Sequence, residues 1–383
     1  MEEFRNVTDR RGFLSTLGKG GTALVGLAVS AKSLGIRSAN AKVPEKIVIG
    51  YLPVNAETVI YQNPVNYWKE AGLNVELFLA RGGPAILQAM TSGSVPVGDI
   101  GNGPAVIVAA RGLPFYYLTL GAFSSPERTY TRIMVREDSP IKKFEDLKGK
   151  KLGVHQRGTM EDLSLGAVAK SFDIRKQDID ITFVPFPNQP QALASGLVDA
   201  IYTIPPFDAI MSQRLGGRTL AVTSDFVPYL GYGTLALRRD FASEFPEAVT
   251  KLVSAWILTS RWIRDNTEEA RKTGNAFFKI PADIGPKVTV PHWAKNPLPV
   301  MPNIWHIYHL LLEGKIIKPM DDPKKVINEY FVEPTRRFVE PVMSEIGYVS
   351  DPLQKAMIQG RYPLLPQPNE TYYAPWERTI LAT

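Results

Sequence analysis

The sequence predicts an α/β protein of two lobes, each a β-sheet flanked by helices, with two strands crossing between them. Short β-rich runs alternate with helical patterns from residue 47 onward, which is typical of βαβ units. A strand at 129–135 would take the chain out of the first lobe, and an apolar run at 233–237 would bring it back. The segment between these two runs therefore becomes an inserted second lobe.

The first part of the first lobe is expected to span residues 42–135. Its expected elements are strands at 47–51, 73–79, 97–100 and 116–120 with helices at 61–72, 84–93 and 104–112. The first of these helices should end at Gly72, because glycine is a common helix terminator. Strands and helices that alternate at this pace predict a parallel sheet.

The inserted second lobe is expected to span 136–232, and the first lobe resumes over 233–319. The expected elements of the insert are strands at 151–154, 181–184, 199–202 and 218–222 with helices at 160–172 and 190–196. After the return, a long helix begins at Pro246, where apolar residues such as Val249, Leu252 and Trp256 follow a spacing of three and four. Further helices are expected at 267–280 and 303–314.

The composition of the chain changes after about residue 320. Prolines punctuate this part of the sequence at positions 334, 341, 352, 363, 366, 368 and 375. Proline disrupts helix interiors and the middle of sheets. We therefore expect residues 320–383 to form a Pro-rich extension, mostly irregular, with one or two short helices on the surface.

The first 41 residues have the layout of an export signal. Arg10 and Arg11 precede a short apolar run at 20–31, and the small residues Ala39 and Ala41 follow in an Ala-x-Ala arrangement. This order predicts a twin-arginine signal peptide that is cleaved after export. The apolar run is too short to span a bilayer. The alternative is a chance Arg-Arg pair before an apolar patch. We expect a soluble protein in the periplasm, exported by the twin-arginine machinery.

The composition excludes several classes of function. The chain has no cysteine, so it forms no disulfide, thiolate metal site or cysteine nucleophile. The first 41 residues carry six basic and three acidic residues, so the formal charge of +6 falls to about +3 without them. That charge does not suit a nucleic-acid partner, and the one basic run, 148–151, is typical of a solvated turn.

Several motifs of the mature sequence occur in an order and spacing that resemble one family. They are Lys46–Tyr51, Gly83-Pro84, Gly93–Pro104, Asp138–Ile141, Asp146–Lys151 and Gly196–Ala200. Over about residues 46–317 the chain resembles the substrate-binding proteins of ABC importers, in the branch that binds sulfonates, taurine, nitrate and pyrimidine precursors. The Pro-rich extension has no counterpart in this resemblance.

The resemblance implies the type II periplasmic-binding-protein fold, in which two lobes close on a ligand between them. It implies a monomer whose partners are an inner-membrane ABC permease and its cytoplasmic ATPase. It also implies that the turn after the strand at 199–202 faces the ligand. There Tyr202 and Phe207 supply aromatic character, and Asp208 is a candidate acid.

Three strand-to-helix junctions suggest where an anion binds. They are Arg81–Pro84, Gly101–Pro104 and Arg157–Met160, and each places glycine before the first turn of a helix. Ligands bind at the carboxyl ends of strands in open sheets, and unpaired N–H groups at helix starts attract anions. An ordinary tight turn is the alternative at each junction. Arg157 is the preferred charged partner, although a surface arginine is the plainer interpretation, and Arg81 is weaker.

The candidate ligand-binding residues combine these junctions with nearby aromatic residues. They are Gly83, Pro84, Asn102, Gly103, Arg157, Gly158, Thr159, Met160, Tyr202, Phe207 and Tyr232. The aromatic residues favour a small organic oxyanion, of the sulfonate or sulfate-ester type, over a bare inorganic ion. Core packing is the alternative for each aromatic residue taken alone.

We expect no enzymatic activity, no cofactor and no metal. His306 and His309 lie three apart with Glu313 beyond, but no fourth ligand is indicated. His155 has no visible partner for general-base chemistry. The alternatives are a binding protein that serves a sensor or, less favoured, an exported sulfate-ester hydrolase.

Overall fold

The computed structural model describes residues 42–80 and 82–383, and these belong to one compact unit. The predicted signal residues Arg10, Arg11, Ala39 and Ala41 lie outside the described residues, as does Arg81. Within the described residues, no helix is long and apolar enough to cross a membrane.

The first lobe is built on a five-stranded sheet in the order β2-β1-β3-β12-β4. Its strands are β1 (Ile47–Tyr51), β2 (Val75–Leu79), β3 (Val97–Ile100), β4 (Phe115–Tyr117) and β12 (Thr234–Arg238). β1 is parallel to β2 and β3, but β12 is antiparallel to β3 and β4. The expectation of a purely parallel sheet was therefore wrong, because β12 returns from the second lobe and enters the sheet from the opposite direction.

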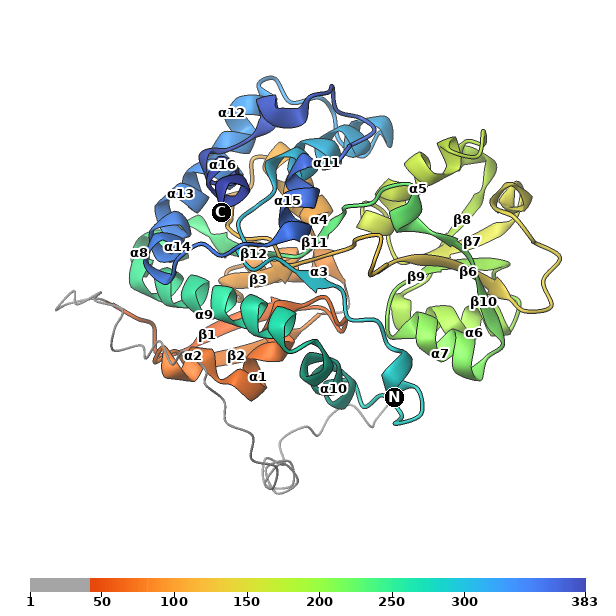
Figure 1. The fold of residues 1–383 in the computed structure, drawn as a ribbon, viewed down its shortest axis with the longest axis horizontal. Helices are drawn as coiled ribbons and strands as arrows, with labels where there is room; N and C mark the ends of the chain where they lie inside the picture. The colour runs from red at the N-terminus through yellow and green to blue at the C-terminus, as the bar shows by residue number, and fades with distance from the viewer. Residues whose placement is uncertain (1–41, 81) are drawn as a thin grey trace. The chain divides into compact units, whose positions relative to one another are not determined.

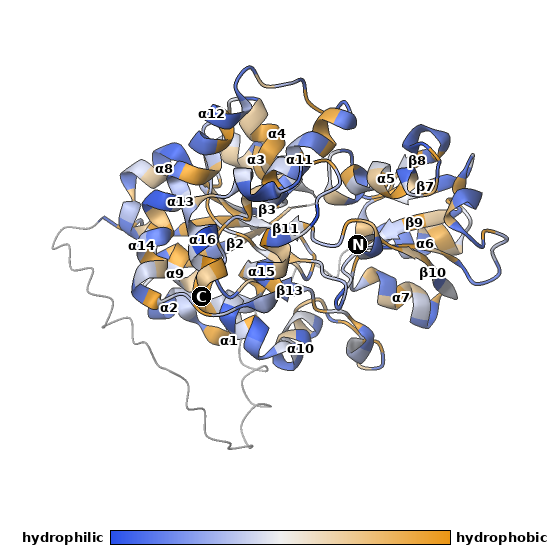
Figure 2. Ribbon diagram, turned by 45° about the horizontal axis from the view of Figure 1, so that its top comes forward, coloured by the Kyte–Doolittle hydropathy of each residue, from blue (hydrophilic) through white to orange (hydrophobic). Residues whose placement is uncertain are grey.

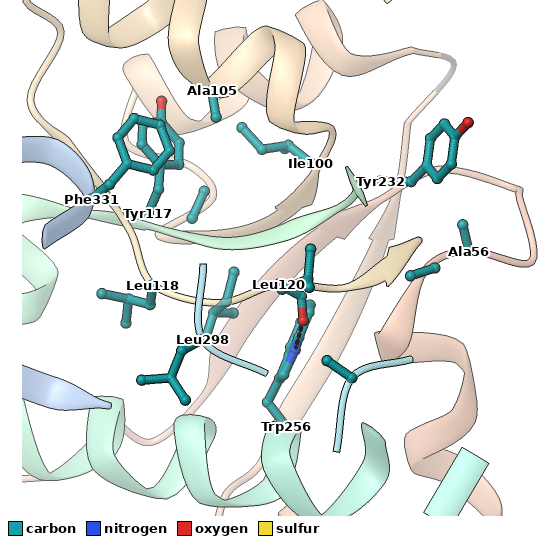
Figure 3. Packing of buried hydrophobic residues seen from close by; sticks show 14 of the residues in the cluster. Ala56, Ile100, Ala105, Tyr117, Leu118, Leu120, Tyr232, Trp256, Leu298 and Phe331 are labelled. Carbon is teal, nitrogen blue, oxygen red and sulfur yellow. Dashed lines mark hydrogen bonds between the residues drawn. The ribbon is translucent and has the colours of Figure 1, made fainter. Parts of the chain in front are cut away.

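Helices surround this sheet and supply most of the first lobe's core. They are α1 (Gln62–Val65), α2 (Tyr67–Glu70), α3 (Gly83–Thr91), α4 (Asn102–Ala110), α8 (Arg239–Glu244), α9 (Pro246–Asp265), α10 (Thr267–Phe277) and α11 (Met301–Glu313). α4 is hydrophobic along most of its length (Figure 2), and most of its residues are buried. The predicted long helix is confirmed as α9, whose Trp256 is buried under Leu120 and donates a hydrogen bond to its carbonyl (Figure 3).

The second lobe has its own five-stranded sheet in the order β10-β6-β9-β7-β8. The elements are β6 (Arg132–Arg136), β7 (Lys151–Val154), β8 (Asp180–Phe183), β9 (Ala200–Thr203), β10 (Gly217–Val222), α5 (Met160–Lys170), α6 (Gln189–Ala194) and α7 (Phe207–Arg214). β6 is antiparallel to β9 and β10, so this sheet is also mixed. β6, which was expected to take the chain out of the first lobe, pairs within the second sheet.

A small third sheet lies where the chain passes between the two larger ones. Its strands, in the order β11-β5-β13, are β11 (Gly231–Tyr232), β5 (Ala122–Phe123) and β13 (His292–Trp293). β5 precedes the second sheet in the chain and β11 follows it, and the two are paired antiparallel. The lobe boundaries at 135 and 232 stay predictions.

The C-terminal extension is helical, which corrects the expectation of an irregular surface segment. Its helices are α12 (Pro323–Ile327), α13 (Glu333–Phe338), α14 (Glu340–Ile346), α15 (Pro352–Gln359) and α16 (Pro375–Ala382). Each has a proline in its first turn. A backbone N–H at that position would have no hydrogen-bond partner within the helix, so proline costs nothing there. Four of the prolines that argued against helices, Pro334, Pro341, Pro352 and Pro375, therefore mark helix starts, whereas Pro363, Pro366 and Pro368 lie in the irregular segment after α15.

These C-terminal helices belong to the core of the first lobe. α13 and α14 contact α9, and α15 contacts α11 (blue in Figure 1). Phe331 stacks on Tyr117 of β4 with ring centroids 5.1 Å apart (Figure 3). The fully buried Trp376 donates a hydrogen bond from Nε1 to the carbonyl of Pro299 at 2.9 Å.

Candidate functional site

A cavity of about 800 Å³ is lined by residues of both lobes. The first lobe contributes the loop after β1, the start of α3 and one side of α4. The second lobe contributes the loop between β7 and α5, together with Phe186 and Ile204. Most of these side chains are apolar, and the volume is in the range that holds a small organic molecule.

The three predicted junctions meet at this cavity. A Cβ atom at Gly83 would lie 3.6 Å from Pro104 at the start of α4. A Cβ atom at Gly103 would lie 2.9 Å from the carbonyl oxygen of Gly158, and one at Gly82 would lie 3.0 Å from the Gln156 side chain. The starts of α3, α4 and α5 are therefore within van der Waals distance of one another, as the sequence analysis expected.

At the junction before α5, a carboxylate of the chain itself, that of Asp162, accepts a backbone hydrogen bond. The Gly158 N–H donates to Asp162 Oδ2 at 2.8 Å, and Lys176 Nζ pairs with Asp162 Oδ1 at 2.5 Å. Asp162 is buried, and Glu161 stands beside it in the first turn. Gly158 has φ of +80°, a conformation in which a side chain would be strained. Asp162 thus takes the Gly158 N–H, whereas no side chain caps the N–H groups at the start of α5 itself, and the anion-binding role of this junction stays a prediction.

The starts of α3 and α4 carry no acidic residue in their first turns. Each has glycine before a proline at the beginning of the helix, and Gly83, Pro84, Gly101 and Pro104 all line the cavity. No side chain caps either helix start. Uncapped N–H groups and the positive end of a helix dipole favour an anion, and the role of these two helix starts in binding one stays a prediction.

Two carboxyl groups meet beneath the loop after β1. Asp99 of β3 is fully buried and accepts a hydrogen bond from the Thr58 N–H at 2.8 Å. Glu57, which lines the cavity, is 4% exposed. Burial raises the pKa of both groups, and the charge of Asp99 raises the pKa of Glu57 further. The pair therefore retains a proton at a pH where isolated carboxyls are ionised.

Glu161 is the second acid of the cavity, and Tyr130 lies near both. Glu161 is 4% exposed, and burial raises its pKa to about 7, against the lowering effect of a hydrogen bond from its own N–H. Burial also raises the pKa of Tyr130, and the charges of Glu161 and Glu57 add to that effect. The Tyr130 ring packs against Tyr232 with centroids 4.7 Å apart. The sequence analysis missed Glu57, Glu161 and Tyr130.

His155 forms an aromatic wall of the cavity together with Phe186. The two rings stack with centroids 4.1 Å apart and an angle of 11°. The Phe186 N–H donates to His155 Nδ1 at 3.3 Å, so Nε2 carries the remaining proton of the neutral ring. Burial lowers the pKa of His155 to about 4. His155 is therefore a neutral hydrogen-bond donor and not a cation at neutral pH.

Among the described residues that line the cavity, the arginines are exposed to solvent. Arg157 and Arg111 line it, and both are exposed. Thr91 and Ser92 at the end of α3 are exposed on the same lining. The cavity lining thus includes two exposed arginines and two buried acids, Glu57 and Glu161.

The structure brings seven of the eleven predicted residues to the cavity lining. They are Gly83, Pro84, Arg157, Gly158, Thr159, Met160 and Tyr232. Asn102 and Gly103 are buried at the start of α4, just behind the lining. The ligand-binding role of all eleven residues stays a prediction.

Tyr202 and Phe207 do not line the cavity. The Tyr202 hydroxyl is hydrogen-bonded to Ser164 at 2.8 Å inside the core of the second lobe. The ring of Phe207 stacks behind Phe186 with centroids 6.2 Å apart. Asp208 forms an ion pair with Arg132, so it is not free to meet a ligand.

The histidine pair of α11 does not form a metal site. His306 is fully buried, and its ring packs edge-on against Tyr362 with centroids 5.4 Å apart. Residues 42–80 and 82–383 contain no group of three or more His, Asp or Glu side chains placed to hold a metal ion.

The family of the chain follows from comparison with known proteins. The NMT1-like family matches residues 40–276, more than half of the sequence, and the chain belongs to that family. The taurine-binding periplasmic protein of Escherichia coli (strain K12) is 27% identical over 206 residues, which cover 53% of this chain and 62% of that protein. A binding protein of Brucella abortus (strain 2308) is covered over 65% of its length at 26% identity. The chain thus spans less than two thirds of these relatives.

Solved structures show the same fold. The alkanesulfonate-binding protein SsuA from Xanthomonas axonopodis pv. citri, bound to MOPS, has a TM-score of 0.64 at 19% identity and covers 77% of this chain and 99% of its own. The nitrate-binding protein NrtA from Synechocystis PCC 6803 has a TM-score of 0.67 at 14% identity, covering 80% and 90%. The predicted type II fold is confirmed, and the relatives named above are described as binding proteins.

Proposed function

We propose that this chain is the periplasmic solute-binding component of an ABC importer and that it binds a small organic oxyanion between its lobes. The observation that supports the proposal is the cavity itself. Two helix starts without acidic residues open into an apolar space of about 800 Å³. A bare inorganic ion would leave most of that space empty, whereas a sulfonate or sulfate ester with an organic body would fill it.

The proposed binding mode places the oxyanion at the starts of α3 and α4 and the organic body against Phe186, Met160 and Tyr232. Closing the lobes removes water from the site, so each hydrogen bond to the head group becomes stronger. The closed form would then be presented to an inner-membrane permease with its cytoplasmic ATPase. The protein is proposed to act as a monomer, without a cofactor.

Export by the twin-arginine route remains part of this proposal. Replacing Arg10 and Arg11 together by lysine is expected to leave the precursor in the cytoplasm, because that route depends on the arginine pair. Cell fractionation would detect the retained precursor. Normal export of the double variant would indicate the general secretion route.

A thermal-shift screen of the mature protein tests the proposed ligand class. The panel contains alkyl and aryl sulfonates, sulfate esters, nitrate and aromatic carboxylates. A ligand present at about 100 times its dissociation constant should stabilise the protein by about 2.7 kcal/mol. Stabilisation by nitrate alone, or by none of the anions, would contradict the proposal.

A further inference from the structure

The two lobes also touch outside the cavity lining. Residues 280–291 join α10 of the first lobe to β13 of the small third sheet, and on the way they reach α7 of the second lobe. Ile284 and Val288 of this segment pack with Ala209 of α7, and none of the three is more than 3% exposed. This apolar cluster is separate from the cores of both lobes, so it belongs to the contact between them.

Polar side chains join the same two elements. Arg214 of α7 donates from Nη2 to both carboxylate oxygens of Asp283, each at 2.8 Å. Asp208 of α7 forms an ion pair with Arg132, and the Arg132 Nη2 also donates to Thr289 Oγ1 at 3.4 Å. The segment is thus held to the second lobe by apolar packing and by two sets of polar contacts.

The segment is also tied to the loop after β1, which lines the cavity. Asn55 of this loop is buried, and its neighbours on both sides in the sequence belong to the cavity lining. The Asn55 Nδ2 donates to the carbonyl of Thr289 at 2.9 Å. A ligand that contacts this loop therefore contacts a loop that is hydrogen-bonded to the segment.

At α5 the two lobes are joined more extensively than at α7. Met160 and Leu163 of α5 are buried in the same hydrophobic core as α4 and α11 of the first lobe. Parting the lobes there would expose part of that core, whereas parting them at α7 would expose only the small cluster around Ile284. The cost of exposing apolar side chains grows with their area. The contact at α7 is therefore the weaker of the two.

We propose that residues 280–289 form a strap that holds the two lobes closed in the absence of ligand and releases α7 when the lobes part. The strap then sets how much of the ligand-free protein is already closed. A ligand that binds the closed form better shifts the population further in that direction. This inference rests on the proposed function only for the closing of the lobes on a ligand.

Distances between spin labels test the strap without any ligand. Gln213→Cys on α7 and Lys272→Cys on α10 place one label on each side of the strap at exposed positions. The chain has no other cysteine, so both labels are unique. Pulsed electron paramagnetic resonance on the mature protein should show mainly the shorter distance. Ile284→Ala combined with Val288→Ala should reduce that shorter-distance population at least twofold.

Matched variants separate the strap from general stability. Ile181→Ala removes an apolar side chain that packs within the second lobe, so it should lower the melting temperature and leave the distances unchanged. Arg214→Ala removes only the exposed ion pair of the strap and should give a smaller shift in the same direction. Its control is Arg175→Ala, which breaks an exposed ion pair inside the second lobe. If the double alanine variant does not fold, as judged by circular dichroism, Arg214→Ala carries the comparison.

Calorimetry with benzenesulfonate as the probe then measures the coupling to binding. When only the closed form binds, the apparent affinity is proportional to the closed fraction. The double variant should therefore bind the probe more weakly by the same factor by which its shorter-distance population falls. A clear shift of the distances with an unchanged affinity for the probe would overturn the strap as the device that sets closing.

The remaining outcomes separate this inference from the proposed function. Unchanged distances in a folded double variant overturn the strap and leave the anion-binding function standing. A similar loss of the shorter distance in Ile181→Ala overturns it as well, because lower stability alone would then part the lobes. If the strap variants shift the distances as expected but no anion of the thermal-shift panel binds, the strap stands and the proposed function fails.

Discussion

The helices that meet at the cavity begin in opposite ways in the two lobes. In the first lobe, α3 and α4 start with glycine and proline and have no acid in the first turn. In the second lobe, α5 carries Glu161 and Asp162 in its first turn, and Asp162 accepts a hydrogen bond from the Gly158 N–H. Similar strand-to-helix junctions therefore differ in the charge that they present. The difference comes from acidic side chains in the first turn of the helix.

This difference assigns separate tasks to the lobes. Helix starts that remain open attract anions, whereas a helix start already filled by a carboxylate repels them. On the proposed function, the first lobe would then be the anchor for the oxyanion. The second lobe contributes the aromatic wall of His155 and Phe186 and the acid Glu161.

The largest effect, a loss of folding stability, is expected from removing the Asp162 carboxylate at the junction before α5. Asp162→Ala leaves Lys176 with only the backbone carbonyl of residue 162 as a partner and the Gly158 N–H without its carboxylate acceptor. Breaking a buried pair on one side costs about 3 kcal/mol. Chemical denaturation of the ligand-free protein should show that loss. A variant as stable as wild type would mean that Asp162 does not fill the junction.

The next largest effect, a loss of ligand affinity, is expected when an acidic residue is placed in the first turn of α3, as α5 has in the second lobe. Gly83→Asp introduces a carboxylate into the first turn of α3, where a Cβ atom meets nothing closer than 3.6 Å. The new acid should compete with the ligand's oxyanion and lower its affinity about 100-fold, or about 2.7 kcal/mol. Calorimetry measures the affinity, and an unchanged melting temperature shows that the fold is intact.

A smaller loss of affinity is expected at the exposed end of the cavity. Arg157→Ala should weaken anion binding about tenfold, or about 1.4 kcal/mol, if the guanidinium pairs with the ligand when the lobes close. Arg111→Ala is the parallel variant on the first lobe. Unchanged affinity in the Arg157 variant would remove that residue from the site.

A dependence of stability on pH is expected as well. Because the pKa values of Asp99, Glu57 and Glu161 are raised in the folded state, the native protein holds protons that the unfolded chain releases. The free energy of unfolding should therefore fall as the pH rises from 6.5 to 8, by up to about 1.4 kcal/mol per unit and per group. The lowered pKa values of the four histidines, His155, His292, His306 and His309, raise the stability as the pH rises through their unfolded value of 6.5, so they oppose this trend until about pH 7.5.

Glu57→Gln provides the test of that trend. The variant removes one acid of the buried pair, so its stability should fall less between pH 6.5 and 8 than that of wild type. Denaturation curves at both pH values measure the difference. An identical slope in the two proteins would show that the Glu57–Asp99 pair does not titrate in this range.

The order of the elements and the meeting of three junctions could be predicted from sequence, because both depend on local signals. Apolar runs bounded by glycine located β1, β3 and β7, and the rule that ligands gather at strand ends placed Gly83, Pro84 and Gly158 on one cavity. Local signals did not reveal that β12 runs antiparallel to β3, because its direction depends on how the chain returns from the second lobe.

The acids and the C-terminal helices were missed for identifiable reasons. Glu57 follows β1 through a six-residue loop, so the strand-end rule would have included it had it been applied to the first strand. The role of Asp162 depends on a contact with Gly158 that spacing alone does not reveal. In the extension, prolines such as Pro352 and Pro375 were taken as helix breakers although they stand in first turns.

The most direct test of the account is a calorimetric titration of the preferred anion from the screen into wild-type protein, Gly83→Asp and the control Glu137→Gln, which changes an exposed acid away from the cavity. We predict one bound molecule per chain in the wild type and the control, and an affinity about 100-fold lower in Gly83→Asp. Undiminished binding to Gly83→Asp would show that the ligand's oxyanion does not lie at the start of α3, and the proposed site would be wrong.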